Sequence, residues 1–209
     1  MKRDFMNKPN ESTQIGFAFS KFDQMLSPSK GSIIFEMTDT LTGEVTRFEK
    51  NNVITLDAGI HAARLFKDNQ EPNFGAYMLA IGTGATGALL SPDSPDPKQR
   101  KLNNEIERKG FASVTFRDSL GNAVAYPTNV VDFTCVYGES EAVGPLNEMG
   151  LISPLSANPS QKTPNPNNFP TRDVSLDITQ YDVLLNYLTF GVITKPSTAT
   201  LSITWRLTF

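Results

Sequence analysis

The sequence predicts a mainly β protein, an antiparallel β-sandwich or jelly-roll-like domain with one short α-helix near residues 57–67 and an extended N-terminal arm. Three observations support this fold class. Apolar and polar residues alternate repeatedly from residue 31 to the end of the chain. Only one segment spaces its apolar residues as a helix does, and turn residues separate the alternating segments. We therefore divide the 209 residues into an arm, 1–30, and a single β-rich domain, 31–209.

The arm is the first element, and it has little periodicity. It mixes polar residues with the isolated aromatic residues Phe17, Phe19 and Phe22. Such a segment is either a flexible tail or an arm whose aromatic side chains dock on a neighbouring subunit. We favour the arm, so these three residues are candidate subunit contacts.

A β-hairpin is expected next. Residues 32–38 and 44–49 have strand-like character, and residues 39–43 between them include the turn formers Asp39 and Gly43. Residues 53–55 are predicted to return briefly to a strand.

The predicted helix begins at Asp57, a good N-cap residue, and ends near Lys67. We expect its apolar face to pack on the core. That face carries Ile60, Ala63, Leu65 and Phe66. His61 lies one position away from this face, which predicts a boundary position.

The rest of the chain is strand-like. Predicted strands lie within residues 111–116, 129–138, 141–153, 182–194 and 201–209, and the last alternates most regularly. Residues 154–170 are rich in Pro, Asn and Ser, which predicts a long surface loop. Because such loops often contact partners, Asn165 and Phe169 are further candidate subunit contacts.

One segment fits a nucleotide-binding pattern. Gly82, Gly84 and Gly87 follow a short apolar run and match G-x-G-x-x-G. A dinucleotide site also needs a helix after the glycines, and the three prolines within residues 92–97 exclude one. We therefore interpret these glycines as structural turn residues, and we interpret Gly150 as a bulge or turn residue.

Composition excludes several kinds of site. The net charge of -3 and the isoelectric point near 5.2 argue against a surface that neutralises nucleic-acid phosphates. With one His and one Cys, the usual zinc sites cannot form, and a Ser-His-Asp arrangement would have to use His61. Cys135 alternates with polar neighbours and is predicted to be buried. We expect no catalytic residue, no metal site and no cofactor.

Several short motifs occur in a characteristic order. An Asn-Val-Ile-Thr segment and a small helix precede a Gly-Thr-Gly turn, a Leu-x-x-Glu-x-x-Arg segment, a Gly-Leu pair and a terminal strand with tryptophan. The matching residues are Asn52, Val53, Ile54, Thr55, Gly82, Thr83, Gly84, Leu102, Glu105, Arg108, Gly150, Leu151 and Trp205. This order, over about residues 40–209, resembles structural proteins of tailed-bacteriophage virions.

The resemblance implies a non-enzymatic virion component that binds other copies of itself and other virion proteins, as a ring or a trimer. Neither nucleic acid nor a membrane is an expected partner. The leading hypothesis is a neck, collar or tail position, with Glu105 and Arg108 as candidate subunit contacts; the alternative is a capsid decoration protein. A carbohydrate-binding sandwich for host attachment, using tyrosines or Trp205, is a different class of function. Another is a glycosidase using Glu139 and Glu141.

Overall fold

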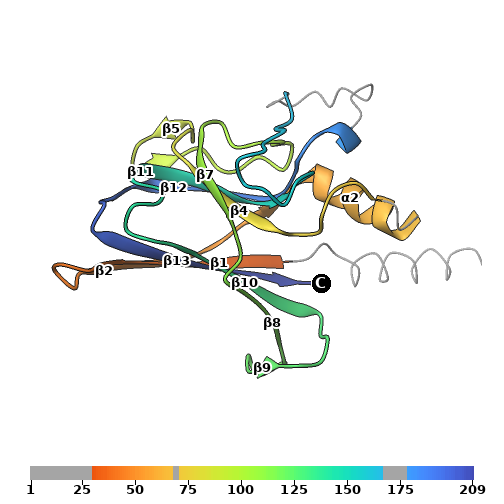
Figure 1. The fold of residues 1–209 in the computed structure, drawn as a ribbon, viewed down its shortest axis with the longest axis horizontal. Helices are drawn as coiled ribbons and strands as arrows, with labels where there is room; N and C mark the ends of the chain where they lie inside the picture. Colours follow the sequence, from red (N-terminus) through yellow and green to blue (C-terminus); the bar gives the residue numbers. More distant parts are fainter. Residues whose placement is uncertain (1–29, 68–70, 167–177) are drawn as a thin grey trace, which may run out of the picture.

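The chain folds into two antiparallel sheets with one α-helix (Figure 1). The computed structural model describes residues 30–67, 71–166 and 178–209. The predicted mainly β, antiparallel fold class is confirmed. Four candidate contacts, Phe17, Phe19, Phe22 and Phe169, lie outside the described residues.

Sheet A has six strands and contains both the predicted hairpin and the terminal strand. In spatial order its strands are β2 (Val45–Asn51), β1 (Lys30–Asp39), β13 (Ala199–Thr208), β10 (Val130–Tyr137), β8 (Ser113–Arg117) and β9 (Ala123–Val124). β13 lies between β1 and β10, so the last strand of the chain occupies the middle of this sheet.

Sheet B has five strands, and a small two-stranded hairpin lies beside it. In spatial order the strands are β3 (Val53–Ile54), β12 (Val183–Lys195), β11 (Gly144–Ser153), β4 (Met78–Gly82) and β7 (Glu105–Gly110). The hairpin consists of β5 (Gly87–Ala88) and β6 (Ser91–Pro92), and a 3₁₀ turn, η1, covers Ile178–Gln180. The chain crosses from sheet B to sheet A between β7 and β8.

The two sheets enclose one large core. Alternate residues of β13, including Ile203 and Trp205, are fully buried and meet apolar residues of sheet B such as Leu79 and Leu151. Sheet B is also covered on its other face, where a second cluster contains Met78, Leu102, Ile152, Leu184 and Tyr187. Because both faces are buried, all five residues of β4 are buried, which explains why that segment does not alternate.

The helix, α2 (Leu56–Lys67), was predicted in the right place but with the wrong face inward. Its N-cap is Thr55, whose hydroxyl accepts a hydrogen bond from Ala58 N at 3.1 Å, so the prediction of Asp57 as N-cap is wrong. The buried residues of the helix are Asp57 and His61. Leu65 and Phe66, by contrast, are exposed, Phe66 by 92%.

An ion-pair cluster lies on the outer face of sheet A. Asp132 is buried to 2% exposure and accepts hydrogen bonds from Arg206 (2.7 and 2.9 Å) and Arg117 (2.8 Å). Burial by itself would raise the pKa of Asp132, but the hydrogen bonds from Arg206 and Arg117 outweigh burial and hold the pKa below its ordinary value of 3.8.

This cluster predicts an acid-labile contribution to stability. Because the folded pKa of Asp132 is depressed, the stabilisation is complete above the unfolded pKa, near 3.8, and is lost as the pH falls through the folded value. At pH 7 the Asp132→Asn variant should be about 2 kcal/mol less stable than the wild type. That difference should shrink below pH 4 in urea unfolding measured from pH 7 to pH 2. Parallel pH profiles for the two proteins would contradict the assignment.

Candidate functional site

The glycine turn after β4 holds a carboxylate of its own chain. Glu148, on β11, is fully buried. Its Oε1 accepts hydrogen bonds from Gly84 N at 2.9 Å and Asn104 N at 2.8 Å. Its Oε2 accepts from Asn103 N at 3.1 Å and from the Tyr187 hydroxyl at 2.7 Å. Three backbone amides and one phenol therefore surround this carboxylate, and we name this group, Gly84, Asn103, Asn104, Glu148 and Tyr187, the glutamate cradle.

The close packing of the cradle requires glycine at two of its positions. A Cβ on Gly82 would lie 2.3 Å from the Asn104 carbonyl oxygen, and a Cβ on Gly84 would lie 2.4 Å from Asn104 N. Neither residue has a positive φ; Gly87 does, at 94°. Gly87 begins β5 rather than a turn, and its positive φ is what favours glycine there, whereas Gly82 and Gly84 are glycine because another backbone segment passes against them.

Gly150 is not a turn residue. It lies within β11, opposite Tyr187 of β12 and Ala80 of β4. A Cβ there would lie 2.5 Å from Leu184 Cδ1 and 2.6 Å from the Asn186 carbonyl oxygen. Register shifts occur elsewhere in β11, between Leu146 and Glu148 and between Leu151 and Ile152. The glycine here permits close packing of the chain; of the two predicted alternatives, the turn is wrong, and the nearest strand irregularity begins one residue later, at Leu151.

The amides of the glycine turn are already bonded within the chain. Thr83 N donates to Asn104 O at 3.0 Å, Gly84 N to Glu148, and Ala85 N to Asn147 Oδ1 at 3.0 Å. A phosphate cradle needs such amides to be free. The turn does use amides to bind an anion, but that anion is the Glu148 side chain.

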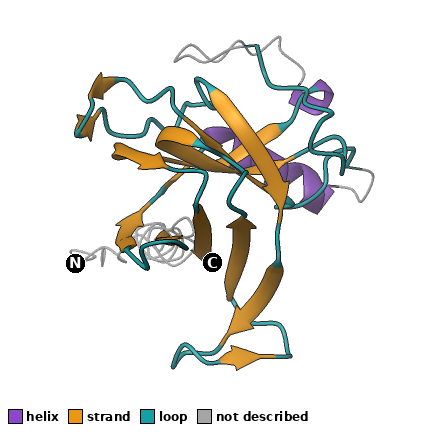
Figure 2. Cartoon of the chain, turned by 60° about the vertical axis from the view of Figure 1, so that its left-hand side comes forward, coloured by secondary structure: helices purple, strands orange, loops and turns teal. Residues whose placement is uncertain are grey.

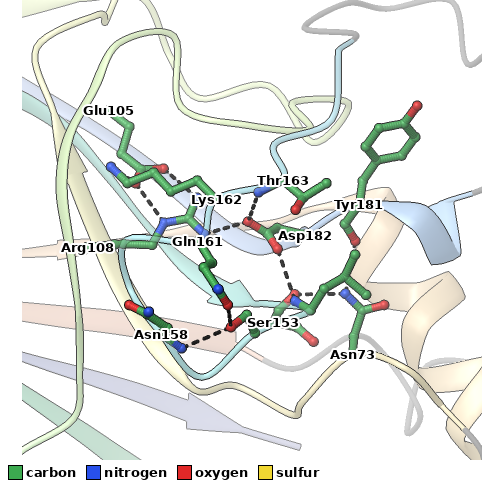
Figure 3. A network of polar contacts seen from close by, with 12 residues as sticks. Asn73, Glu105, Arg108, Ser153, Asn158, Gln161, Lys162, Thr163, Tyr181 and Asp182 are labelled. Atoms are coloured by element: carbon green, nitrogen blue, oxygen red, sulfur yellow. Dashed lines mark hydrogen bonds and ion pairs between the residues drawn. The ribbon is translucent and has the colours of Figure 1, made fainter.

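A second polar network lies beside the cradle, where β7 meets the loop after β11 (Figure 3). Arg108 is 4% exposed and donates to both oxygens of Glu105, at 2.7 and 2.8 Å, and to Asp182 Oδ2 at 2.5 Å. Lys162 also pairs with Glu105, at 2.8 Å. Burial acts to raise the pKa of Glu105, but the contacts with Arg108 and then Lys162 outweigh it, so the pKa of Glu105 is lowered.

A β-bulge brings the first two of these side chains together. In a regular strand, residues three apart point to opposite faces. Gly82 pairs with Glu105 and Ile81 pairs with Glu107, so Ile106 is an extra residue in β7. The bulge places Glu105 and Arg108 on the same side of the strand.

The network fastens the 154–170 loop to the sheet. Asp182 accepts hydrogen bonds from Leu155 N and Thr163 N, both at 3.0 Å, in addition to its pair with Arg108 (Figure 3). Just before the loop, Asn73 Nδ2 donates to Ser153 O at 3.1 Å. The described part of the loop, 154–166, is therefore held at both ends by one buried carboxylate.

These positions alter the expectations for two predicted subunit contacts. The structure buries Arg108 within its own chain, bonded to Glu105 and Asp182, so it is not available to a neighbour. Asn165, expected on the loop surface, is only 2% exposed. Both residues build the chain's own interior because the loop folds back against sheet B.

A triad-like arrangement joins α2 to the end of β11. Ser153 Oγ lies 3.2 Å from His61 Nε2, and His61 Nδ1 lies 3.8 Å from Glu71 Oε1. Ser153 and His61 are 0% and 3% exposed, so a substrate carbonyl cannot reach the hydroxyl, which also contacts Phe74 O. Burial lowers the pKa of His61 more than Glu71 raises it. These contacts form a buried polar link between α2 and β11. His61 is buried, so the prediction that it lies at a boundary is wrong.

Two alternative functions raised from the sequence, sugar binding and glycoside hydrolysis, depend on residues whose surroundings the structure describes. Trp205 is fully buried, as core packing requires, and cannot stack on a sugar. Glu141 lies at an open pocket of about 570 Å³, where hydrogen bonds from Lys109 and Gly138 N lower its pKa. A glycosidase acid needs a raised pKa.

Cys135 was predicted to be buried, and it is. Burial raises the pKa of its thiol to about 12.

No protein-family model matches the chain, and no curated protein matches it. Within residues 30–67, 71–166 and 178–209, no group of three or more His, Cys, Asp or Glu side chains is placed to hold a metal ion. In the same described part of the chain, no helix is long and apolar enough to cross a membrane.

Glu148 and Asp182 organise the two networks, and neither was predicted from the sequence. The available signal was position: Glu148 directly precedes the apolar run 149–152 within a predicted strand. A carboxylate within a buried strand needs donors, and the glycine turn was the segment of the chain with backbone amides to supply them.

Proposed function

We propose that this protein is a non-enzymatic structural component of a tailed-bacteriophage virion. In this role it binds other copies of itself and other virion proteins, in the neck, collar or tail region. It acts by presenting a rigid surface, and its buried polar groups serve to hold that surface in shape.

The motifs that carry the resemblance lie close together in the folded chain, and this supports the proposal. The Gly-Thr-Gly turn, the Leu-x-x-Glu-x-x-Arg segment and the Gly-Leu pair are far apart in sequence. Their strands β4, β7 and β11 are neighbours in sheet B, and Asn104 and Gly84 both bind Glu148. The motif order that suggested the family therefore has a physical reason, since these segments build one structural unit.

The observation that carries the proposal is the outward apolar face of α2. Its exposed residues are Leu56, Gly59, Ala62, Ala63, Leu65, Phe66 and Lys67. All but the last are apolar or glycine. A soluble helix normally buries its apolar face, so a helix that exposes it is suited to a protein partner.

Two measurements test the proposal together. Size-exclusion chromatography with light scattering should show a defined oligomer at high protein concentration. Labelled antibody should mark a fixed place on purified virions in negative-stain images, and copy number then separates a neck or tail ring from a capsid decoration protein present in hundreds of copies. A strictly monomeric protein that is absent from particles would refute the proposal, and specific binding on a glycan array would favour the host-attachment alternative.

A further inference from the structure

The face of α2 described above is an exposed apolar surface within the part of the chain that the structure describes. Its small residues, Gly59, Ala62 and Ala63, let another chain approach closely, while Leu56 and Phe66 supply large apolar groups at its two ends. The opposite side of the helix is polar and fixed: Asp57 pairs with Arg100 at 3.1 Å, and Arg64 contacts Glu71. The helix therefore cannot rotate its apolar face inward without breaking buried ion pairs.

The second uncovered surface is the overhang of sheet A, which we define as β8, β9 and the turn between them. Figures 1 and 2 show these strands extending beyond sheet B. Val114 is paired with Phe133 and Phe116 with Val131, so both lie on the core side of sheet A. Val114 is nonetheless 55% exposed, and Leu120 at the turn is 85% exposed. Phe116 packs against the core, whereas Val114 and Leu120 have little of their surface covered.

Charge distinguishes the two surfaces. The exposed face of α2 has one charged residue, Lys67, at its C-terminal end. On the overhang, Arg117 is paired with Asp132, and the turn beside it carries Asp118, whose pKa is lowered by hydrogen bonds from the Asn122 side chain and from backbone amides. Opposite charges next to apolar contacts favour one docking orientation over others.

We propose that α2 of one copy packs on the overhang of a second copy. This inference rests on the proposed self-assembly and names the two surfaces that meet. Because the surfaces are different and lie on different sides of the molecule (Figure 1), the contact is head-to-tail, and repetition gives a closed ring or a filament.

The proposed contact is small, which is why a stable oligomer should require a closed ring. A helix of 12 residues is about 18 Å long, so one of its faces is much smaller than the roughly 800 Å² per partner of a standard interface. An isolated pair of copies should bind weakly. In a closed ring every copy uses both surfaces, so the oligomer is stabilised by ring closure.

Paired cysteines test the contact. The full chain carries Ala63→Cys on α2, Val114→Cys on the overhang, or both, and is treated with a short bis-maleimide at the concentration where oligomers form. Native Cys135 is buried and serves as the unreactive background. Only the double variant should give a ladder of cross-linked oligomers, whereas a mixture of the two single variants should stop at dimers.

Other results would overturn the contact. Dimers from Ala63→Cys alone would show that two α2 helices pair. Cross-links that appear only after removal of residues 1–29 would show that this segment covers the helix. Oligomers or labelled virions without any cross-link would reject these surfaces while leaving the proposed function intact; a monomer absent from particles would reject both.

A matched pair of substitutions gives an independent measurement. Phe66→Glu should weaken self-association at least about tenfold without changing the melting temperature, because Phe66 is almost fully exposed in one copy. Leu41→Glu, in the β1–β2 turn and 79% exposed, makes the same kind of change away from both surfaces and should leave association unchanged. Equal effects of the two variants would contradict the inference.

Discussion

Replacing Glu148 with leucine is expected to destabilise the protein by about 4 kcal/mol. The substitution removes the acceptor for three backbone amides, Gly84 N, Asn103 N and Asn104 N, and for the Tyr187 hydroxyl. Hydrogen bonds to a charged group contribute about 1.5–3 kcal/mol each, and donors left without a partner add a desolvation penalty. Leucine recovers part of this loss through apolar burial. The measurement is the free energy of unfolding in urea at pH 7.

Two controls separate the cradle from the mere presence of a carboxylate. Glu148→Gln keeps one acceptor oxygen but turns an amide group toward the backbone N–H donors, so an intermediate loss of about 2 kcal/mol is expected. Glu49→Leu removes an exposed glutamate from β2 and should change stability by at most about 0.5 kcal/mol. If Glu148→Leu is as mild as Glu49→Leu, the hydrogen bonds to Glu148 do not stabilise the fold.

The sequence predicted the strands well where one face of a sheet is buried and the other is exposed to solvent. β13 is the clearest case, because Ile203 and Trp205 are buried while Thr204 and Arg206 are only partly so. β4 and β11 were harder to identify, since both of their faces are buried and no alternation results.

The orientation of α2 could not be predicted from its own residues. Amphipathicity identifies an apolar face, but not what covers it. The inward face is decided by partners distant in sequence, Arg100 for Asp57 and Ser153 for His61. Similarly, the glycine pattern indicated an anion held by backbone amides, but only the fold shows that the anion is Glu148.

Replacing Arg108 with methionine is expected to cost about 4 kcal/mol, because it leaves the partly buried Glu105 and the buried Asp182 without the guanidinium that neutralises them. Glu105 keeps its pair with Lys162, so Asp182 bears most of the effect. Because Asp182 also binds Leu155 N and Thr163 N, the loop should loosen first. Hydrogen exchange at residues 155–163 should therefore accelerate more than exchange in β13.

The double variant Arg108→Met/Asp182→Asn decides whether charge or contact is responsible. Asparagine keeps an acceptor oxygen for one of the two loop amides but carries no charge, so the double variant should be more stable than Arg108→Met alone. This recovery is expected because an unpaired buried charge is more costly than a lost hydrogen bond. If the two losses simply add, Arg108 and Asp182 act independently, and the loop is held by hydrogen bonds alone.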